Sequence, residues 1–413
     1  MSYQQIKACR ICGNTSLELV LDLGKQALTG VFPRSRSQSV TSGPLRLVKC
    51  VGEGNCGLLQ LEHTYSLSEM YGYNYGYRSG LNQSMAKHLQ NKVAHILSFY
   101  KPTKGSIVLD IGSNDGTTLA AYPDCYELLG IDPTVSKFRQ FYPDHITAVS
   151  DFFSEEVFRD VVGNRQASIV TSFSMFYDLE NPLDFMQEVY DILAPDGVWV
   201  FEQSYMPTML QNNSYDTVCH EHLTYYGMTQ IQWMLSRVGF KAVDVELNNV
   251  NGGSFSIIAT KMSSSTPESP KVHSLLNREL ELGLNESLAY LEFAKRTEKN
   301  RDCLVQFLNS KKEGKVVGAL GASTKGNVFL QYCGLSSNDV VAVGEINSDK
   351  FGAFTPGTFI PIIPEYELMN LKPDYLIVLP WHFRNTFVNK IKSNASLVFA
   401  IPNLEIIKRE TNE

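Results

Sequence analysis

Residues 106–122 read SIVLDIGSNDGTTLAAY, and this stretch decides the fold of the chain. The apolar run at 107–111 is short and is followed by a turn, which predicts a strand buried in a parallel sheet. The turn is GSNDG at 112–116, and a helical pattern begins after it. A strand, a glycine turn and a helix in this order favour a doubly wound α/β domain, whose ligands bind at the carboxyl ends of the strands.

The sequence around this segment alternates between strand and helix patterns. We expect helices at 82–100 and 228–240, and a final pair of strands that forms an antiparallel hairpin around NNVNGG. Such a hairpin at the end of the domain is typical of methyltransferases rather than of dinucleotide dehydrogenases. The further candidate strands are ELLGID (127–132), ITAVS (146–150), SIVTSF (168–173), GVWVFEQ (197–203), 241–248 and 254–261.

The chain of 413 residues is long for a single core. We expect an N-terminal domain at 1–66, a central α/β domain at 67–270 and a C-terminal Rossmann-like domain at 271–413. The polar stretch at 263–271, SSSTPESPK, reads as a linker or surface loop, and residues 272–312 predict a long amphipathic helix. The leucines at helical spacing are Leu275, Leu276, Leu280, Leu284, Leu288 and Leu291.

Charge and hydropathy exclude several classes of partner. The 36 basic and 43 acidic side chains give a net charge of −7, which argues against a nucleic-acid partner. No apolar run approaches the roughly 20 residues that span a bilayer. The start, MSYQQIKACRICG, has no apolar core of a signal peptide. We therefore expect a cytoplasmic protein that acts on a small molecule, with no membrane partner and no obligatory protein partner.

The glycine turn and the strand ends predict a site for S-adenosylmethionine. Gly112 lets the backbone approach the methionine part of the cofactor, and Asp110 is placed to hold its ammonium group. Asp132, at the end of the next strand, can accept hydrogen bonds from the ribose hydroxyls. A site for NAD is the competing interpretation, but GSNDG does not fit G-x-G-x-x-G. The remaining candidate cofactor-binding residues are Asn114, Asp151 and Phe152, the last two beside the adenine.

Four cysteines in the N-terminal region predict a structural zinc site. Cys9 and Cys12 form a C-x-x-C knuckle, and Cys50 and Cys56 follow some forty residues later. Four thiolates complete the tetrahedral coordination of zinc and leave no position for water. The second pair is spread to C-x5-C, and four unrelated buried cysteines are the alternative. The expected zinc supports folding and has no part in catalysis.

The segment YDTVCHEHLTYY at 215–226 follows the fifth strand, where methyltransferases of this fold place residues that bind the methyl acceptor. His220, Glu221 and His222 concentrate groups that move protons near neutral pH. Surface or core histidines are the alternative. A second aromatic cluster, MYGYNYGYRSG at 70–80, is as compatible with a packed loop as with a substrate lid.

The C-terminal region contains a second strand, glycine turn and helix start, VVGALGASTKGN at 316–327. Glycine-rich turns at helix N-termini bind phosphate, and Ser323, Thr324 and Lys325 add donors and charge. We expect a diphosphate site here, with Lys325 the charge best placed beside the turn; a Rossmann-like domain without a ligand is the alternative. The other candidate residues of this module are Asn327, Glu345, His382 and Arg384.

Taken in order, these motifs resemble one family. They are the cysteine knuckles, YGYRSGLNQSM (75–85), LDIGSNDG (109–116), CHEHLTYY (219–226), GASTKGN (321–327) and PWHF (380–383). The chain resembles the three-domain sugar C-methyltransferases that act on nucleotide-linked 4-keto deoxysugars, over nearly its whole length. The resemblance implies a zinc domain, a class I methyltransferase domain, and a sugar nucleotide bound between the central and C-terminal domains. Two features depart from the pattern: the spread second cysteine pair, and Cys219 where the family often has an aromatic residue.

The resemblance also implies roles for individual residues in methylation at C-3 through an enolate. His222 is the expected base, Glu221 orients the sugar or a histidine, and His220 and Tyr73 are candidates to hydrogen-bond the enolate oxygen. Tyr77 and Arg78 are expected to contact the substrate. Two other functions stay open: an O- or N-methyltransferase acting on a nucleotide sugar, and a nucleotide-sugar-binding protein without catalytic activity.

Overall fold

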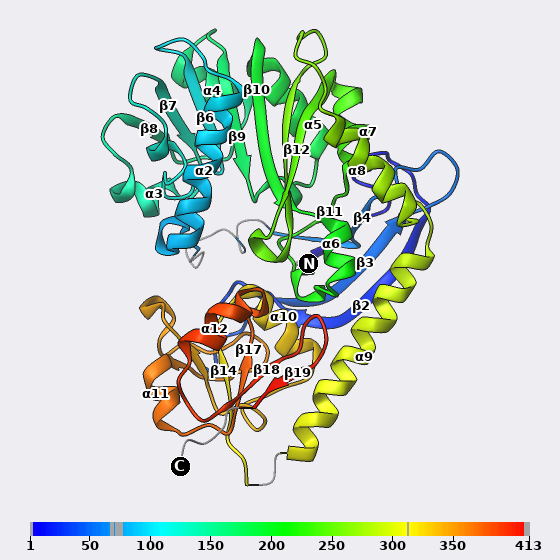
Figure 1. Ribbon diagram of the computed structural model, residues 1–413, viewed down its shortest axis with the longest axis vertical. Helices are drawn as coiled ribbons and strands as arrows, with labels where there is room; N and C mark the ends of the chain where they lie inside the picture. The colour runs from blue at the N-terminus through cyan, green and yellow to red at the C-terminus, as the bar shows by residue number, and fades with distance from the viewer. Residues whose placement is uncertain (1–2, 67–69, 71–76, 312–313, 409–413) are drawn as a thin grey trace.

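The computed structural model describes residues 3–66, 70, 77–311 and 314–408, and forms two α/β lobes joined along one side. In Figure 1 the long helix α9 runs down that side from the upper lobe to the lower one, while strands β2 and β3 cross where the lobes meet. Within the described residues no helix has both the length and the apolar character to cross a membrane.

The upper lobe contains a seven-stranded sheet in the order β12-β13-β10-β9-β6-β7-β8. Strands β8, β7, β6, β9 and β10 are parallel, and β13 lies antiparallel between β10 and β12. Counted along the chain this is the order 3-2-1-4-5-7-6, so the expected doubly wound sheet with a terminal antiparallel hairpin is confirmed. The strands are β6 Ile107–Ile111, β7 Glu127–Ile131, β8 Ile146–Val149, β9 Ala167–Phe173, β10 Leu193–Ser204, β12 Phe240–Asn248 and β13 Ser254–Lys261.

Helices cover both faces of this sheet because alternate strand residues point to opposite sides. Val198 and Val200 pack in one apolar cluster with α2, whereas Trp199 and Phe201 pack in another with α4, α5, α7 and α8. The expected helix at 82–100 is α2. The helices of this lobe are α2 Gln83–Phe99, α3 Val135–Phe138, α4 Glu155–Val162, α5 Pro182–Ile192, α6 Met206–Gln211, α7 Met228–Val238 and α8 Pro270–Glu281, with 3-10 turns η1 Ser79–Leu81, η2 Leu119–Ala121, η3 Arg139–Phe141, η4 Phe176–Asp178, η5 Tyr215–Thr217 and η6 Val250–Gly252.

The lower lobe contains a six-stranded sheet in the order β16-β15-β14-β17-β18-β19, parallel except for β19. This is the Rossmann order 3-2-1-4-5-6, with the switch point between β14 and β17. Its elements are α9 Leu288–Lys311, β14 Val317–Leu320, α10 Thr324–Tyr332, β15 Val343–Glu345, η7 Ser348–Lys350, β16 Ile362–Pro364, α11 Glu365–Asn370, β17 Tyr375–Val378, η8 Trp381–Phe383, α12 Arg384–Lys390, β18 Ser396–Phe399 and β19 Glu405–Ile407.

The N-terminal region forms a four-stranded sheet, β11-β4-β3-β2, and a separate pair, β1-β5. Strand β11 comes from the HEHLTYY segment and pairs antiparallel with β4, so a loop of the upper lobe completes this sheet. The strands are β1 Tyr3–Gln5, β2 Leu17–Ala27, β3 Ser42–Cys50, β4 Leu59–Leu61, β5 His63–Tyr65 and β11 Thr224–Tyr225.

The expectation of one amphipathic helix at 272–312 is wrong. The segment divides into α8 and α9, because Gly283 adopts a left-handed φ of 64° just after α8. Leu280, near the end of α8, and Leu288, at the start of α9, are 66% and 61% exposed instead of facing a core. Val272 and Leu275 of α8 pack with the upper lobe.

Glu279 of α8 caps the start of α7. Its carboxylate accepts hydrogen bonds from the backbone N–H groups of Met228 (2.5 Å) and Thr229 (2.9 Å), the Thr229 hydroxyl (2.7 Å) and the Tyr205 hydroxyl (2.8 Å). A Cβ at Gly227 would lie 2.9 Å from this carboxylate, which explains a glycine at that position. The anion also lies at the positive end of the α7 dipole.

We expect Glu279→Gln to lower the free energy of unfolding by about 1–3 kcal/mol, because one buried acceptor and the negative charge are lost. Urea denaturation measures the change. Glu281→Gln, at an exposed position on the same helix, is the control and should change stability by less than about 0.5 kcal/mol. Equal stability of the Glu279 variant and the wild type would contradict the capping role.

Candidate active site where the lobes meet

The glycine turn after β6 closes against the loop after β9. Gly112 has φ 72°, and a Cβ there would lie 3.1 Å from Met175 Cγ. Asp110 is buried and accepts a hydrogen bond from the Thr171 hydroxyl at 2.5 Å. Burial raises the pKa of Asp110 to about 7. A cationic ligand group beside this carboxylate would restore its ionised form, as the ammonium of an amino-acid ligand does.

Asp132, at the carboxyl end of β7, holds the glycine turn in place. It accepts hydrogen bonds from the backbone N–H of Asn114 (2.9 Å) and from the N–H and hydroxyl of Thr134 (2.6 and 2.5 Å). A carboxylate has about four acceptor sites, so one remains for a ligand hydroxyl. The structure thus brings together Asp110, Gly112, Asn114 and Asp132. Asp151 and Phe152 lie exposed after β8.

The segment with Tyr77 and Arg78 lies over the glycine turn. Asn114 donates a side-chain hydrogen bond to the Tyr77 carbonyl oxygen (3.1 Å) and accepts one from the Ser79 N–H (3.0 Å). Arg78 Nε lies 3.6 Å from Asp115 Oδ2. These contacts place the segment at the carboxyl edge of the upper sheet, beside the turn after β6. Tyr73 lies outside the described residues.

His222 is held in one tautomer by a backbone carbonyl. Its Nδ1 lies 2.9 Å from the Thr217 carbonyl oxygen, which can only accept, so Nδ1 carries the proton and the Nε2 lone pair is available. The ring packs against Tyr177, with centroids 4.3 Å apart. Burial lowers the pKa of His222 to about 3, and the positive charge of Lys325 acts in the same direction. The imidazole is therefore neutral at neutral pH.

Glu221 points to a different neighbour. It accepts a hydrogen bond from the Thr29 hydroxyl at 3.3 Å, and a Cβ at Gly30 would lie 2.6 Å from its Oε1. Thr324 Oγ1 lies near the same point, 3.9 Å from that Cβ position. Burial raises the pKa of the Glu221 carboxyl. Glu221 thus lies between the N-terminal region and the first turn of α10, while the Thr217 carbonyl orients His222.

His220 lies against the β1–β5 pair of the N-terminal region. It is fully buried and packs edge-on against Tyr65, with ring centroids 4.6 Å apart. Burial lowers its pKa to about 3. Its role in holding an enolate oxygen stays a prediction.

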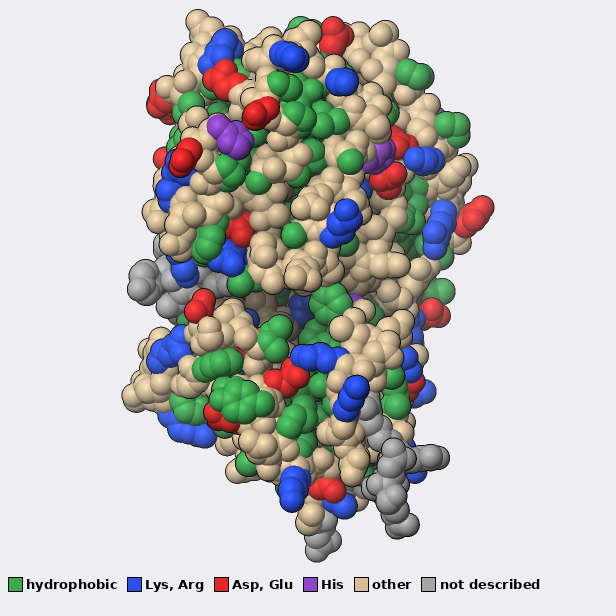
Figure 2. All heavy atoms as spheres, turned by 60° about the vertical axis from the view of Figure 1, so that its left-hand side comes forward, with side chains coloured by type: hydrophobic (Ala, Val, Ile, Leu, Met, Phe, Trp, Pro, Cys, Tyr) green, Lys and Arg blue, Asp and Glu red, His purple; other side chains and the backbone are tan. Residues whose placement is uncertain are grey.

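Lys325, in the first turn of α10, is surrounded by groups from both lobes. Its Nζ donates to the Asn251 carbonyl oxygen in the upper hairpin at 2.6 Å. The Trp381 indole N–H donates to Asp216 Oδ2 at 2.9 Å, also across the lobes. Burial raises the pKa of Asp216 and lowers that of His382 to about 3, and the Lys325 charge lowers both. Figure 2 shows a hollow at the level where the lobes meet.

Other predicted residues of the C-terminal module have protein partners. Ser323 caps α10 by accepting from the Gly326 N–H (3.0 Å), and Asn327 donates to the Thr29 carbonyl oxygen (2.7 Å). Glu345 accepts from the Ala322 N–H at 2.8 Å. Arg384 makes a two-point contact with Glu405. These residues shape the glycine turn after β14 and its surroundings. A ligand that binds there would contact side chains that already have these partners.

Four groups at the site were not predicted from the sequence as site residues: Asp216, Asn251, Trp381 and the Thr217 carbonyl. Asp216 and Trp381 both lie inside motifs that the sequence singled out, but they are 165 positions apart. No local sequence pattern predicts the hydrogen bond between Asp216 and Trp381. The signal that could have found them is the placement of both motifs at the carboxyl edge of a sheet.

The four N-terminal cysteines meet at one point. All four sulfur atoms lie within 4.8 Å of one another, with 3.5 Å between Cys9 and Cys56 and between Cys12 and Cys50. Tetrahedral Zn–S bonds of about 2.3 Å place sulfurs about 3.8 Å apart. Asn14 Nδ2 lies 3.6 Å from Cys50 Sγ and supplies a hydrogen bond to that ligand. The donor set and its spacing fit zinc.

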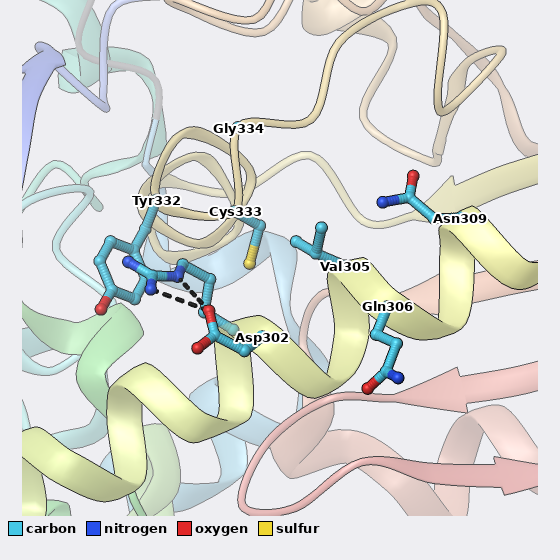
Figure 3. Close-up of a pocket in the computed structure, with 8 residues that line it drawn as sticks. Asp302, Val305, Gln306, Asn309, Tyr332, Cys333 and Gly334 are labelled. Carbon is cyan, nitrogen blue, oxygen red and sulfur yellow. Dashed lines mark hydrogen bonds and ion pairs between the residues drawn. The ribbon is translucent and has the colours of Figure 1, made fainter.

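A pocket of about 630 Å³ lies at the other end of α10 (Figure 3). Figure 3 shows Asp302, Val305 and Asn309 of α9 facing Tyr332 and Cys333 at the end of α10. Since α10 has nine residues, the pocket lies about 12 Å from Lys325 along the helix. A second hollow, of about 330 Å³, is lined by η8, the start of α12 and Glu405. It lies at the carboxyl ends of β17 and β18, beside His382.

Comparisons with known proteins agree with this arrangement. Family models match a zinc binding domain at residues 9–71, a methyltransferase domain at 85–245 and a C-methyltransferase C-terminal domain at 249–402. The C-methyltransferase NovU of Streptomyces niveus is 26% identical over 415 residues, which cover 98% of each chain.

Among solved structures, the plantazolicin methyltransferase BpumL with S-adenosylhomocysteine and an azole analogue aligns with 44% of this chain and 87% of its own, at 10% identity and a TM-score of 0.36. A Burkholderia thailandensis N1-methyltransferase aligns with 44% and 80%, at 12% identity and a TM-score of 0.33.

The strand order and the matched domains define the chain as a class I methyltransferase, an enzyme whose methyl donor is S-adenosylmethionine. The domain order and the full-length relative also make the chain similar to C-methyltransferases that consist of these three domains. Zinc is the second cofactor, at the cysteine cluster.

We expect protein purified without chelator to contain about one zinc per chain, measured by elemental analysis. Cys12→Ser should lower the zinc content and the melting temperature, because metal binding is coupled to folding of this region. Cys303→Ser, on α9, should leave both unchanged. Wild-type protein without stoichiometric metal would contradict the site.

His220 provides a test of burial through pH. An unfolded histidine titrates near 6.5, whereas the folded pKa is about 3, so the unfolded state binds one more proton between these values. Stability therefore falls as the pH falls from about 6.5 towards 3. Between pH 7 and pH 5 the wild type should lose about 2 kcal/mol more than His220→Phe, which has no titrating group.

Urea denaturation at the two pH values measures this difference. His145→Phe, at an exposed position, keeps His220 and should lose as much stability between the two pH values as the wild type. An equal loss of stability in the wild type and His220→Phe would contradict the lowered pKa.

Proposed function

We propose that the enzyme methylates C-3 of a nucleotide-linked 4-keto deoxysugar. The observation that carries this proposal is the neutral, half-buried His222, with Nδ1 held by Thr217 and Nε2 available, whose pKa the charge of Lys325 from the other lobe also lowers. A carbon acceptor needs such a base, because carbon is a poor nucleophile until it loses a proton. The C-methyltransferase NovU supports carbon as the acceptor.

The reaction then has two steps. His222 removes the C-3 proton, which is acidic because the neighbouring carbonyl accepts the electron pair as an enolate. Bound S-adenosylmethionine supplies a sulfonium methyl group, and the enolate carbon attacks it in line. The residues of the chain must bring the carbon to the methyl and keep water away.

For the cofactor we propose the edge built by Asp110, Gly112, Asn114 and Asp132. Asp110 meets the ammonium group, and the remaining acceptor site of Asp132 meets a ribose hydroxyl. Asp151 and Phe152 lie in the loop after β8, on the side where the adenine would extend. Tyr77 and Arg78 cover the turn, and we propose that they close over the bound reactants.

For the sugar nucleotide we propose the space between the lobes. The sugar lies beside His222 and Glu221, and the nucleotide extends along the C-terminal module. The domain limits that we propose for the chain are 1–66, 67–270 and 271–413. The residues that we assign to this space between the lobes are Ser323, Thr324, Lys325, Asn327, Glu345, His382 and Arg384. The helix N-terminus of α10 supports an anionic or oxygen-rich ligand here.

An O- or N-methyltransferase is the second candidate, and it would need no acidic carbon. Exchange of a C-3 deuterium with water, without cofactor, separates the two, because only the C-methylation route breaks that bond. A nucleotide-sugar-binding protein would neither exchange the deuterium nor transfer the methyl group.

We expect His222→Asn to keep the fold and both ligands bound but to lower turnover by about 10²–10⁴, the usual contribution of a positioned base. The substrates are nucleoside-diphosphate 4-keto-6-deoxyhexoses with deuterium at C-3, and mass spectrometry measures its loss. His273→Asn, at an exposed position, is the control. Exchange by the His222 variant at the wild-type rate would place the base elsewhere.

A further inference from the structure

Lys325 is a half-buried cation between the lobes, on the helix whose first turn also approaches Glu221 near Gly30. It belongs to the first turn of α10, donates to the Asn251 carbonyl oxygen, and acts electrostatically on His222, His382 and Asp216. Burial lowers its own pKa, while Asp216 and Cys219 act against this. A buried cation is costly unless charge compensates it. Asp216 supplies one such charge, held by Trp381.

A cation opposes the work of a nearby general base. When His222 accepts a proton it becomes an imidazolium, and Lys325 disfavours this second positive charge. The arrangement favours proton removal only where negative charge develops at the same time near the cation. In deprotonation beside a ketone, that charge develops on the ketone oxygen.

We propose that Lys325 is a catalytic residue whose ammonium binds the substrate's ketone oxygen and stabilises the enolate oxyanion formed there. The inference rests on the proposed function and gives Lys325 a different task from holding the diphosphate. A compact ammonium with three donors suits one oxygen atom, and the partial positive charge at the start of α10 acts in the same direction.

The surroundings of Lys325 support this role. Three residues from outside the C-terminal domain accept hydrogen bonds from α10 or from η8. Asn251 accepts from Lys325 and Thr29 accepts from Asn327, both in α10. Asp216 accepts from Trp381 in η8. Asp216 Oδ1 is buried and has no hydrogen-bond partner among the described residues, so its charge is free to act on Lys325. In a site enclosed by protein, fixed donors stabilise a developing anion more than they do in water.

The proposed step balances in atoms and electrons. The proton moves from C-3 to His222 Nε2, and the C–H electron pair becomes the C3–C4 double bond. The carbonyl π pair moves to oxygen, where Lys325 meets the new charge. In the transfer that follows, the oxygen returns its pair, C-3 forms the new bond to the methyl carbon, and the sulfur keeps the pair of the broken C–S bond.

Lys325→Met tests this role, because methionine fills the space without the charge. The probe is the deuterium exchange at C-3 described above, at saturating sugar nucleotide and without cofactor. We expect exchange to slow by about 10²–10³, the usual cost of removing one oxyanion donor. The dissociation constant of the sugar nucleotide should rise less than about fivefold. Lys315→Met, at the opposite end of β14, is the control and should match the wild type.

Lys325→Arg separates oxyanion stabilisation from phosphate binding and keeps the charge if the methionine variant does not fold. Arginine binds phosphates well, but its planar fork cannot replace a point charge at one oxygen. Exchange should fall at least tenfold with binding retained. Full exchange in the arginine variant, or weaker binding with unchanged exchange in the methionine variant, would overturn the proposal. Failure of the wild type to exchange any probe would instead count against the proposed function.

Discussion

The hydrogen bond from the Trp381 indole to Asp216 fixes how the two lobes meet. Asp216 is followed directly by Thr217, whose carbonyl oxygen sets the tautomer of His222. The contact therefore connects the segment after β17 in the lower lobe to the orientation of the His222 imidazole in the upper lobe. The charge of Asp216 also opposes the lowering of the Lys325 pKa by burial.

The same α/β plan occurs twice in the chain, and a small difference separates the two sheets. The upper sheet ends in a hairpin whose strand β13 lies between β10 and β12, and the lower sheet ends in a single antiparallel strand, β19. The carboxyl edge of each sheet faces the junction of the lobes and carries a glycine turn and an acidic residue at a strand end. This residue is Asp132 in the upper sheet and Glu345 in the lower sheet. Both acids hold their own turn by accepting a backbone N–H.

The sequence was sufficient for the two sheets, because buried parallel strands are short apolar runs and glycine turns are local signals. It was also sufficient for the cysteine cluster. It failed at 272–312, where one glycine in a left-handed conformation outweighs the leucine pattern. It could not show that the Thr217 carbonyl rather than Glu221 orients His222, because every residue has a backbone carbonyl and the sequence does not distinguish them. Contacts such as Asn327 with Thr29 join distant parts of the chain and follow only from the packing of domains.

The pairing of β11 with β4 has a consequence for the exchange of domains between related enzymes. Thr224 and Tyr225 lie two and three residues beyond His222, yet they complete the sheet of the N-terminal region. A chimaera cut at the end of that region would leave this edge of the sheet facing a foreign partner. Recombination that preserves the pairing must therefore transfer the segment from η5 to β11 together with the N-terminal sheet. In evolution and in engineering, these two segments act as one unit although they are far apart in the sequence.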